Sequence, residues 1–186
     1  LHTSLKNKTL SSITQAGLVN NLNDGMIWGL LPILLLSNGF ELKEIGIIAA
    51  SYPFIWGVSQ LGTGKIADHF SKKKLIFSGL LLQGIVLILI PEFLNFYSQL
   101  SLMFMMGIGT ALVYPTFMAA IADYTHPIQR AESIGTFRLW RDLGYAIGAV
   151  LSGILADIWG IPTTILLIGI LTIFSSFIVQ FRMKSD

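Results

Sequence analysis

Asp24 has the most evident chemistry in the sequence, because it is a carboxylate inside a long apolar stretch, residues 10–36. Asn20, Asp24 and Trp28 recur every four residues, and Asn23 lies beside them. This spacing places an amide, a carboxylate and an indole on one stripe of a helix. An aspartate at the centre of a membrane helix costs about 2.5–3.5 kcal/mol, so such residues usually face a protein interior or a wet cavity. The stripe predicts a polar ligand site, with interhelical hydrogen bonding as the alternative.

A second charged group, Arg138, Arg141 and Asp142, lies within the apolar stretch 133–156. The four-residue step from Arg138 to Asp142 allows an ion pair along the helix, which leaves Arg141 without a partner on that helix. We favour a salt bridge from Arg141 to another helix, acting as a gate. Snorkelling of Arg141 to the headgroups and binding of an anionic ligand are the alternatives.

Two other stretches carry aromatic or polar residues at helical spacing. They contain Tyr52, Trp56, Gln60 and Gly64 in one case and Gly107, Gly109, Tyr114 and Pro115 in the other. Both sets can face a cavity, and Gln60 and Tyr114 are included as candidate cavity residues. Ordinary packing is the stronger interpretation of the tyrosines and of Trp56.

Small residues mark a possible helix crossing and a possible hinge. Gly144, Gly148 and Ser152 repeat every four residues, a spacing that lets two helix backbones approach closely. Pro115 removes one helical hydrogen bond, which permits either a hinge or a fixed kink.

These residues must be positioned by membrane helices, because the composition fits no soluble domain. Apolar residues make up 53% of the chain and charged residues 12%, half the roughly 25% of soluble proteins. Stretches long enough to cross a bilayer, which needs about 20 helical residues, lie at 10–36, 45–67, 75–90, 97–122, 133–156 and 163–181. We therefore predict an all-α membrane protein, one six-helix bundle over residues 1–186. Cysteine is absent, which excludes disulfides and thiolate chemistry.

The distribution of basic residues predicts the orientation. One side of the predicted bundle receives Lys6, Lys8, Lys65, Lys72, Lys73, Lys74, Arg130, Arg182 and Lys184, and the other receives Lys43 with Glu41, Glu44, Glu92 and Asp157. Because short basic loops stay on the cytoplasmic side, both ends of this segment are expected there, in a multi-pass protein of the inner or plasma membrane. The chain begins at Leu1 rather than methionine, so we expect a fragment of a longer protein.

A short internal similarity suggests two repeats, at about 9–92 and 96–182. Residues 64–71 read GKIADHFS at the end of the second predicted span, and residues 153–160 read GILADIWG at the end of the fifth. The two spans leave the membrane on opposite sides, so the three-helix units would be inverted. Inverted repeats are typical of secondary transporters.

The sequence resembles the major facilitator superfamily in three places. Residues 64–74, GKIADHFSKKK, are similar to the family's loop signature, although His69 replaces the usual Arg and Ser71 replaces the second glycine, as in the weaker copy of the C-terminal half. Residues 20–32 resemble its seventh helix and residues 138–144 its eleventh. The resemblance covers essentially the whole chain. It implies that the six spans are helices seven to twelve and that an N-terminal six-helix bundle of the same polypeptide is missing here.

The resemblance also implies roles for individual residues. The helix that carries Asp24 would line the central cavity, and Gly64, Asp68, Lys72 and Lys73 would form a latch for one of two access states. For the lysines, a simple cytoplasmic bias is the alternative. If transport is coupled to protons, Asp24 is the first candidate to carry the proton and Asp142 the second, since a buried carboxylate can titrate near ambient pH.

The predicted function is alternating-access transport of a small solute across the lipid bilayer, as a proton-coupled permease. Efflux of drugs or toxic compounds by the same fold is the alternative, together with a six-helix chain that works as a homodimer and a non-transport membrane assembly subunit. We expect no enzyme, because no catalytic constellation lies at one depth. We expect no cofactor or metal site, since His69 and His126 lack ligand spacing, and no nucleic-acid partner.

Overall fold

The computed structural model describes residues 7–184, except for the side chains of residues 64–69. The described chain is helical and contains no strand. Its elements are α1 (Lys8–Ser37), α2 (Leu42–His69), α3 (Lys72–Leu89), α4 (Phe96–Asp123), the short 3-10 helix η2 (Pro127–Gln129), α5 (Arg130–Trp159) and α6 (Ile161–Arg182).

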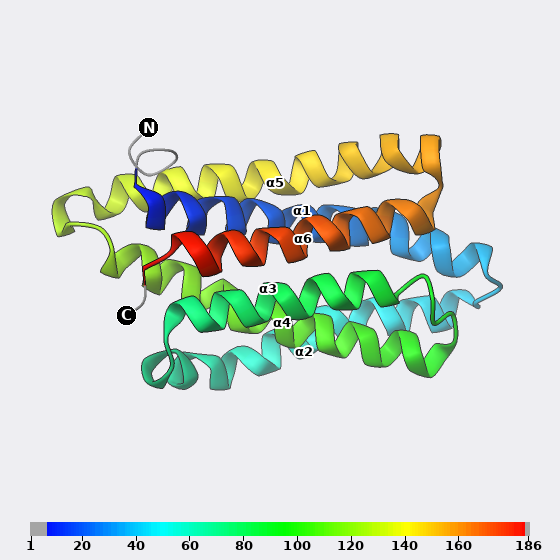
Figure 1. Cartoon of the computed structure of the whole chain (residues 1–186). Coiled ribbons are helices and arrows are strands. Elements are labelled where there is room, and N and C mark those ends of the chain that lie inside the picture. Colours follow the sequence, from blue (N-terminus) through cyan, green and yellow to red (C-terminus); the bar gives the residue numbers. More distant parts are fainter. Residues whose placement is uncertain (1–6, 185–186) are drawn as a thin grey trace.

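The six helices lie lengthwise in one bundle (Figure 1). Helices α1, α5 and α6 lie on one side, and α2, α3 and α4 lie on the other. The closest neighbours are α1 with α5, α2 with α4, and α3 with both α6 and α4. Because α3 and α6 join the two sides, α2 and α5 are left at the margins, each packed mainly on one neighbour.

The helix ends follow local chemistry. The Asn7 side chain caps α1 by accepting hydrogen bonds from the backbone N–H groups of Thr9 and Leu10 at 3.0 and 3.1 Å. Gly160 ends α5 with a φ of 83°, a left-handed conformation that favours glycine. Pro162 follows in the first turn of α6, where its missing N–H costs nothing.

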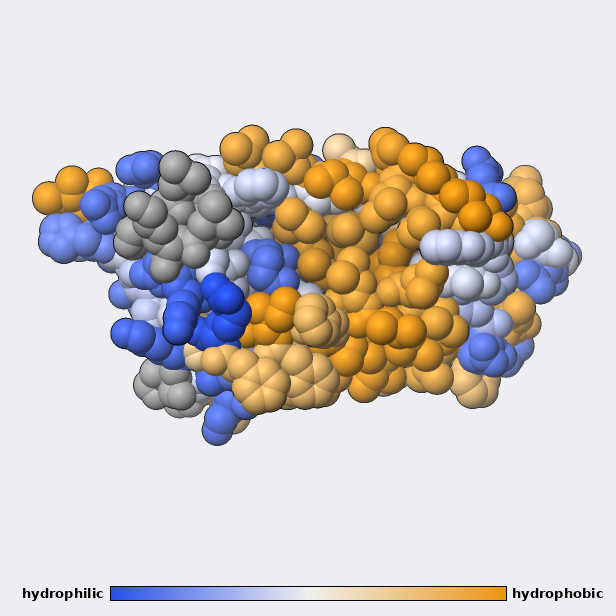
Figure 2. Space-filling model, turned by 45° about the horizontal axis from the view of Figure 1, so that its top comes forward, coloured by the Kyte–Doolittle hydropathy of each residue, from blue (hydrophilic) through white to orange (hydrophobic). Residues whose placement is uncertain are grey.

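The outer surface is that of a multi-pass membrane protein. Figure 2 shows hydrophobic residues in a broad belt across the middle of one face, with hydrophilic residues at both ends. By length and composition, four segments of the described chain can cross a membrane: Leu42–Thr63, Phe96–Asp123, Pro127–Trp159 and Ile161–Arg182.

Two of the six predicted spans, those in α1 and α3, do not meet this criterion. The middle of α1 is polar, since it carries Asn20, Asn23 and Asp24. Helix α3 has 18 residues and begins with the three lysines of residues 72–74, which shortens its apolar part. Asn20 and Asn23 are covered by the other helices, so mean hydropathy underestimates the tendency of this helix to lie in a membrane.

Backbone contact holds α1 against α5. A Cβ added to Gly144 would lie 2.2 Å from the Leu18 carbonyl oxygen, and one added to Gly148 would lie 2.3 Å from that of Leu22. Both glycines are buried, as is Ser152. The tight crossing predicted from the four-residue spacing is therefore confirmed, and its partner is α1.

Glycine pairs also join α3 to its two neighbours. Cβ atoms on Gly84 and Gly169 would each meet the carbonyl oxygen of the other, at 2.9 and 3.0 Å, where α3 crosses α6. Gly79 and Gly109 stand in the same reciprocal relation where α3 crosses α4. Close packing of small residues replaces the hydrophobic driving force that lipid cannot supply.

Substitution of Gly148 by alanine should destabilise the bundle, because its Cβ would collide with backbone that cannot rotate away. We expect a loss of about 1–3 kcal/mol, the usual cost of overpacking. The matched control is Gly153→Ala on the same helix, where an added Cβ meets nothing within 4 Å. Thermal unfolding in detergent measures both. Equal melting temperatures for the two variants would contradict the crossing.

Candidate functional site

The candidate site is built around Asp24, near the middle of α1. The Tyr52 hydroxyl of α2 donates a hydrogen bond to Asp24 Oδ1. The Thr110 hydroxyl of α4 lies 3.1 Å from the Tyr52 hydroxyl oxygen. Since the Tyr52 proton is directed at Asp24, Thr110 is the donor in this second bond. A chain of two hydrogen bonds thus joins three helices at mid-depth, with Tyr52 and Thr110 each 1% exposed.

Asp24 has no cationic partner in the described part of the chain. The ion pairs formed there are Lys72–Asp123 and Arg141–Asp142. Asp24 itself is half-buried. Its negative charge is therefore opposed only by the hydrogen bond from Tyr52, which is unfavourable in an apolar bundle unless a proton or another cation binds to the carboxylate.

An aromatic row extends from Asp24 along the bundle. The ring centroids are 6.1 Å apart for Trp28 and Tyr52, 6.4 Å for Tyr52 and Trp56, and 5.5 Å for Trp56 and Tyr114. Tyr52 and Trp56 are stacked with an interplanar angle of 18°. The Nε1–H of Trp56 is buried and has no hydrogen-bond partner among the described residues. We call Trp28, Tyr52, Trp56 and Tyr114 the aromatic row.

Arg141 of α5 closes the row at its other end. Its guanidinium donates to the Tyr114 hydroxyl at 2.9 Å and lies 5.5 Å from the centre of the Tyr114 ring. Arg141 also pairs with Asp142 at 2.7 Å. The ion pair that the spacing of Arg138 and Asp142 allows is not the one formed, because Asp142 pairs with its sequence neighbour Arg141.

The Asp24 site and the aromatic row lie on an uncovered side of the bundle, which we call the open side. Trp28 is 42% exposed, and Gln60 and Asp142 are also exposed. Two exposed glycines, Gly29 and Gly57, have no neighbouring side chain within 4 Å of an added Cβ. Space is therefore open beside Trp28, and a solute or another protein segment can contact its ring from this side.

Asn20 and Asn23 point instead into the bundle. Asn23 Nδ2 donates to Gln83 Oε1 of α3 at 3.2 Å, and Gln83 Nε2 donates to Asn20 Oδ1 at 2.9 Å. The Thr172 hydroxyl of α6 donates to Asn23 Oδ1 at 2.8 Å. All four side chains are 1% exposed or less. The structure thus gives both asparagines the interhelical role that the sequence left as the alternative, and we call these four residues the amide cluster.

The predicted latch residues lie at the basic end of the bundle. Lys72 forms an ion pair of 2.8 Å with Asp123, which joins the start of α3 to the end of α4. Lys73 is half-buried on the first turn of α3. Gly64 and Asp68 lie in residues 64–69, whose side-chain environment is outside the described part of the structure. The described chain contains no group of three His, Cys, Asp or Glu residues that could hold a metal ion.

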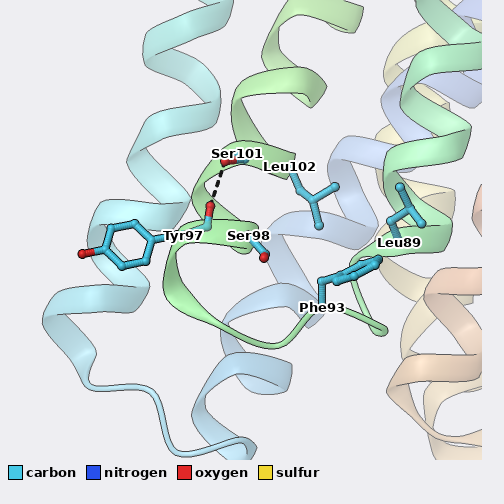
Figure 3. A pocket seen from close by; sticks show the side chains of 6 residues that line it. All are labelled: Leu89, Phe93, Tyr97, Ser98, Ser101 and Leu102. Atoms are coloured by element: carbon cyan, nitrogen blue, oxygen red, sulfur yellow. Dashed lines mark hydrogen bonds between the residues drawn. The ribbon is translucent and has the colours of Figure 1, made fainter.

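A separate hollow of about 320 Å³ lies where α3 ends and α4 begins (Figure 3). It is lined by Leu89, Phe93, Tyr97, Ser98, Ser101 and Leu102. The Ser101 hydroxyl already donates to the Tyr97 carbonyl oxygen at 2.8 Å, and the Tyr97 ring points away from the other side chains. The side chains that line this hollow carry no charge, so it offers a ligand fewer strong polar contacts than the Asp24 site.

The sequence alone does not identify two residues of the site. The spacing of Tyr52 favours ordinary packing, and nothing in the sequence marks Thr110. The available signal was Asp24 itself, since a carboxylate in an apolar helix requires a donor from another helix. Spacing along one helix cannot identify that donor.

Six lengthwise helices, an apolar belt and a polar site at mid-depth define the class as a multi-pass helical membrane protein. The family model of the Major Facilitator Superfamily matches residues 14–185, and the chain belongs to this family. The resemblance predicted from residues 64–74 and the neighbouring helices is thereby confirmed. The family's members are transporters rather than enzymes, as expected.

Several known proteins are similar to this chain. An uncharacterized MFS-type transporter of Methanocaldococcus jannaschii is 29% identical over 88% of the chain and 42% of its own length. The 4-hydroxybenzoate transporter PcaK of Pseudomonas aeruginosa is 21% identical over 83% and 38%, and the quinolone resistance protein NorA of Staphylococcus aureus is 23% identical over 74% and 35%. The chain thus spans less than half the length of these relatives.

The fold is shared with a solved transporter. A bacterial homolog of the human lysosomal transporter Spinster, in an inward-facing and occupied conformation, superposes with a TM-score of 0.81 at 15% identity. The match covers 94% of this chain and 43% of the other. At this identity the likeness establishes the fold alone.

Asn23→Ala should weaken the bundle without affecting the open side, because it removes the donor to Gln83 and the acceptor of Thr172. We expect a stability loss of about 1–2 kcal/mol. The control is Asn21→Ala, since the Asn21 side chain accepts only one long bond of 3.4 Å, from Asn20. Thermal unfolding in detergent measures the loss, and solute binding should not change for either variant. If folded Asn23→Ala bound the solute more weakly, Asn23 would have to contact the solute, contrary to this assignment.

Proposed function

We propose that the complete protein transports a small solute by alternating access and couples this movement to protons. The observation that carries the proposal is Asp24, a half-buried carboxylate at mid-depth with a tyrosine donor and no cationic partner in the described chain. Such a group can take up a proton from one side and release it to the other as the surrounding helices change their access. Asp142 is the second candidate, and its ion pair with Arg141 makes it less available.

The chain would supply one six-span half of this protein. We propose that its spans form two inverted three-helix repeats, about residues 9–92 and 96–182, and correspond to helices seven to twelve. A further six-helix bundle of the same polypeptide would face the open side beside Asp24 and the aromatic row. The coverage of less than half of each relative supports this division.

The proposed solute contacts are Asp24, Trp28, Gln60 and Tyr114, with Trp56 added, and buried Tyr52 holds Asp24 from behind. The exposed positions of Trp28 and Gln60 support this choice, as do the ring contacts that join Trp28 to Tyr114. Asn20 and Asn23 are not included, because the amide cluster satisfies their hydrogen bonds.

We further propose that Arg138, Arg141 and Asp142 contribute to a gate, and that Gly64, Asp68, Lys72 and Lys73 stabilise one access state. The Arg141 contact to Tyr114 supports the first assignment, since it joins α5 to α4 across the open side. The basic end of the bundle would face the cytoplasm. The protein itself would lie in an inner or plasma membrane.

Efflux of toxic compounds is the second candidate function. It is favoured by the similarity to the quinolone resistance protein NorA and by the aromatic row, which presents flat apolar surface to a solute. Uptake and efflux share the same Asp24 chemistry and differ in the direction of solute movement.

Asp24→Asn should abolish coupled proton movement, because an amide cannot carry a proton between the two sides. The complete polypeptide is reconstituted in liposomes with a trapped pH-sensitive dye. A quinolone and 4-hydroxybenzoate are added in turn at saturating concentration. We expect one of them to move protons in the native protein and at least a tenfold slower signal in the variant, by analogy with the loss of a proton-transfer group.

The control is Asp157→Asn, which makes the same chemical change at an exposed position near the end of α5. It should retain the native rate. Native proton movement in Asp24→Asn would remove Asp24 from the coupling reaction and leave Asp142 to be tested.

A further inference from the structure

Three basic residues meet where α1 begins and α6 ends, at the end of the bundle that holds both ends of the chain (Figure 1). The Arg182 guanidinium donates to the Ser11 hydroxyl at 3.2 Å, and that hydroxyl donates to the Lys8 carbonyl oxygen at 3.2 Å. The backbone N–H of Lys184 donates to the Thr9 hydroxyl at 3.3 Å. The side chains of Lys8, Arg182 and Lys184 therefore leave the backbone within one small region, and we call these three residues the Arg182 cluster.

The charge of the Arg182 cluster is not neutralised by the described residues. All three side chains are exposed. The ion pairs of the described chain, Lys72–Asp123 and Arg141–Asp142, involve none of them. The first turn of α1 also contains no acidic residue. This corner of the bundle therefore presents positive charge that is available to an anion.

The Arg182 cluster lies at the edge of the apolar belt. By length and composition, the segment of α6 that can cross a membrane is Ile161–Arg182, so Arg182 is its last residue. Phospholipid phosphates lie just outside the hydrocarbon core, which is about 30 Å thick. The cluster is therefore at the depth of the lipid headgroups.

An exposed aromatic stripe on α6 leads to the cluster from the apolar side. Phe174, Phe177 and Phe181 are three and four residues apart, so they share one face of the helix, and all three are exposed. The rings of Phe177 and Phe181 stack with their centroids 6.3 Å apart, and the Phe77 ring of α3 lies 5.6 Å from that of Phe177. Phe181, next to Arg182, is 82% exposed. This stripe offers a contact to the acyl chains of a lipid, which a free anion in water does not have.

We infer that the Arg182 cluster binds the phosphate of an anionic phospholipid, whose acyl chains lie along the aromatic stripe. Arg182 is the centre of this site, because Ser11 holds its guanidinium in place and a guanidinium can bind two phosphate oxygens at once. Lys8 and Lys184 add charge from α1 and from the segment after α6. The inference goes beyond the proposed transport function and does not depend on Asp24.

A diffuse attraction is the competing explanation. Lys73 and Lys74, at the start of α3, also lie at the basic end of the bundle. Anionic lipids are drawn to clusters of lysine and arginine beside a membrane even where no site is built. A diffuse field treats these cations as equivalent, whereas a built site depends on Arg182 more than on Lys74.

The test compares two phospholipids with the same acyl chains. Phosphatidylglycerol and phosphatidylcholine are titrated into the complete polypeptide in an uncharged detergent, and the first bound lipid is measured by native mass spectrometry. We expect phosphatidylglycerol to bind at least fivefold more tightly. Arg182→Gln should weaken phosphatidylglycerol binding about fivefold, the effect of one cation near an anionic headgroup. Arg182→Lys keeps the charge and should retain most of the preference.

The matched controls are exposed lysines elsewhere on the protein. Lys74→Gln at the same end should change phosphatidylglycerol binding by less than twofold, and Lys43→Gln near the start of α2 should leave it unchanged. Lys184→Gln guards against a folding defect in the Arg182 variants, because only the backbone of Lys184 forms hydrogen bonds to described residues. It should also weaken phosphatidylglycerol binding. Phe181→Ala should weaken the binding of both lipids without changing their ratio.

Three outcomes would overturn the inference. Equal binding of the two lipids would exclude recognition of the headgroup charge. The same loss in Lys74→Gln as in Arg182→Gln would assign the preference to the diffuse field of the basic end. Displacement of phosphatidylglycerol by an excess of inorganic phosphate, with no effect of Phe181→Ala, would assign the site to a free anion rather than to a lipid.

Discussion

Polar groups in the middle of an apolar bundle must find partners inside the protein, and this constraint organises the whole structure. Lipid offers no hydrogen bonds, so each unsatisfied group costs several kcal/mol. The amide cluster meets the constraint completely, because Asn20, Asn23, Gln83 and Thr172 bind one another across α1, α3 and α6. It fixes the position of α1, and α1 in turn presents Asp24 to the opposite side.

The constraint is met differently at Asp24. Tyr52 and Thr110 supply hydrogen bonds but no positive charge, and Trp56 Nε1–H has no acceptor among the described residues. The hydrogen bonds of the amide cluster are therefore satisfied, whereas Asp24 lacks a cationic partner and the buried Trp56 Nε1–H lacks an acceptor among the described residues.

Helix positions and the glycine crossing were predictable, because their signals are local in the sequence. Helices α1 and α5 contain the predicted spans 10–36 and 133–156, and the spacing of Gly144 and Gly148 indicated a close crossing. The site was only partly predictable. Asp24 could be recognised from its cost, but Tyr52 lies 28 residues away on another helix. The Arg141–Asp142 pair was missed because residues adjacent in a helix point in different directions. Only the long Arg141 side chain, held at Tyr114, allows the pair to form.

The glycine crossings and the open site have related consequences for motion. The backbones of α1 and α5 touch at Gly144 and Gly148, so a movement of one helix is expected to displace the other. Arg141 lies one turn from Gly144 on α5 and holds Tyr114 of α4. A change at the aromatic row can therefore reach α5 through one side chain and reach α1 through the crossing. Because Asp24 lies on α1, its helix is joined to α5 by the glycine crossing, and α5 is joined to α4 by the contact of Arg141 with Tyr114.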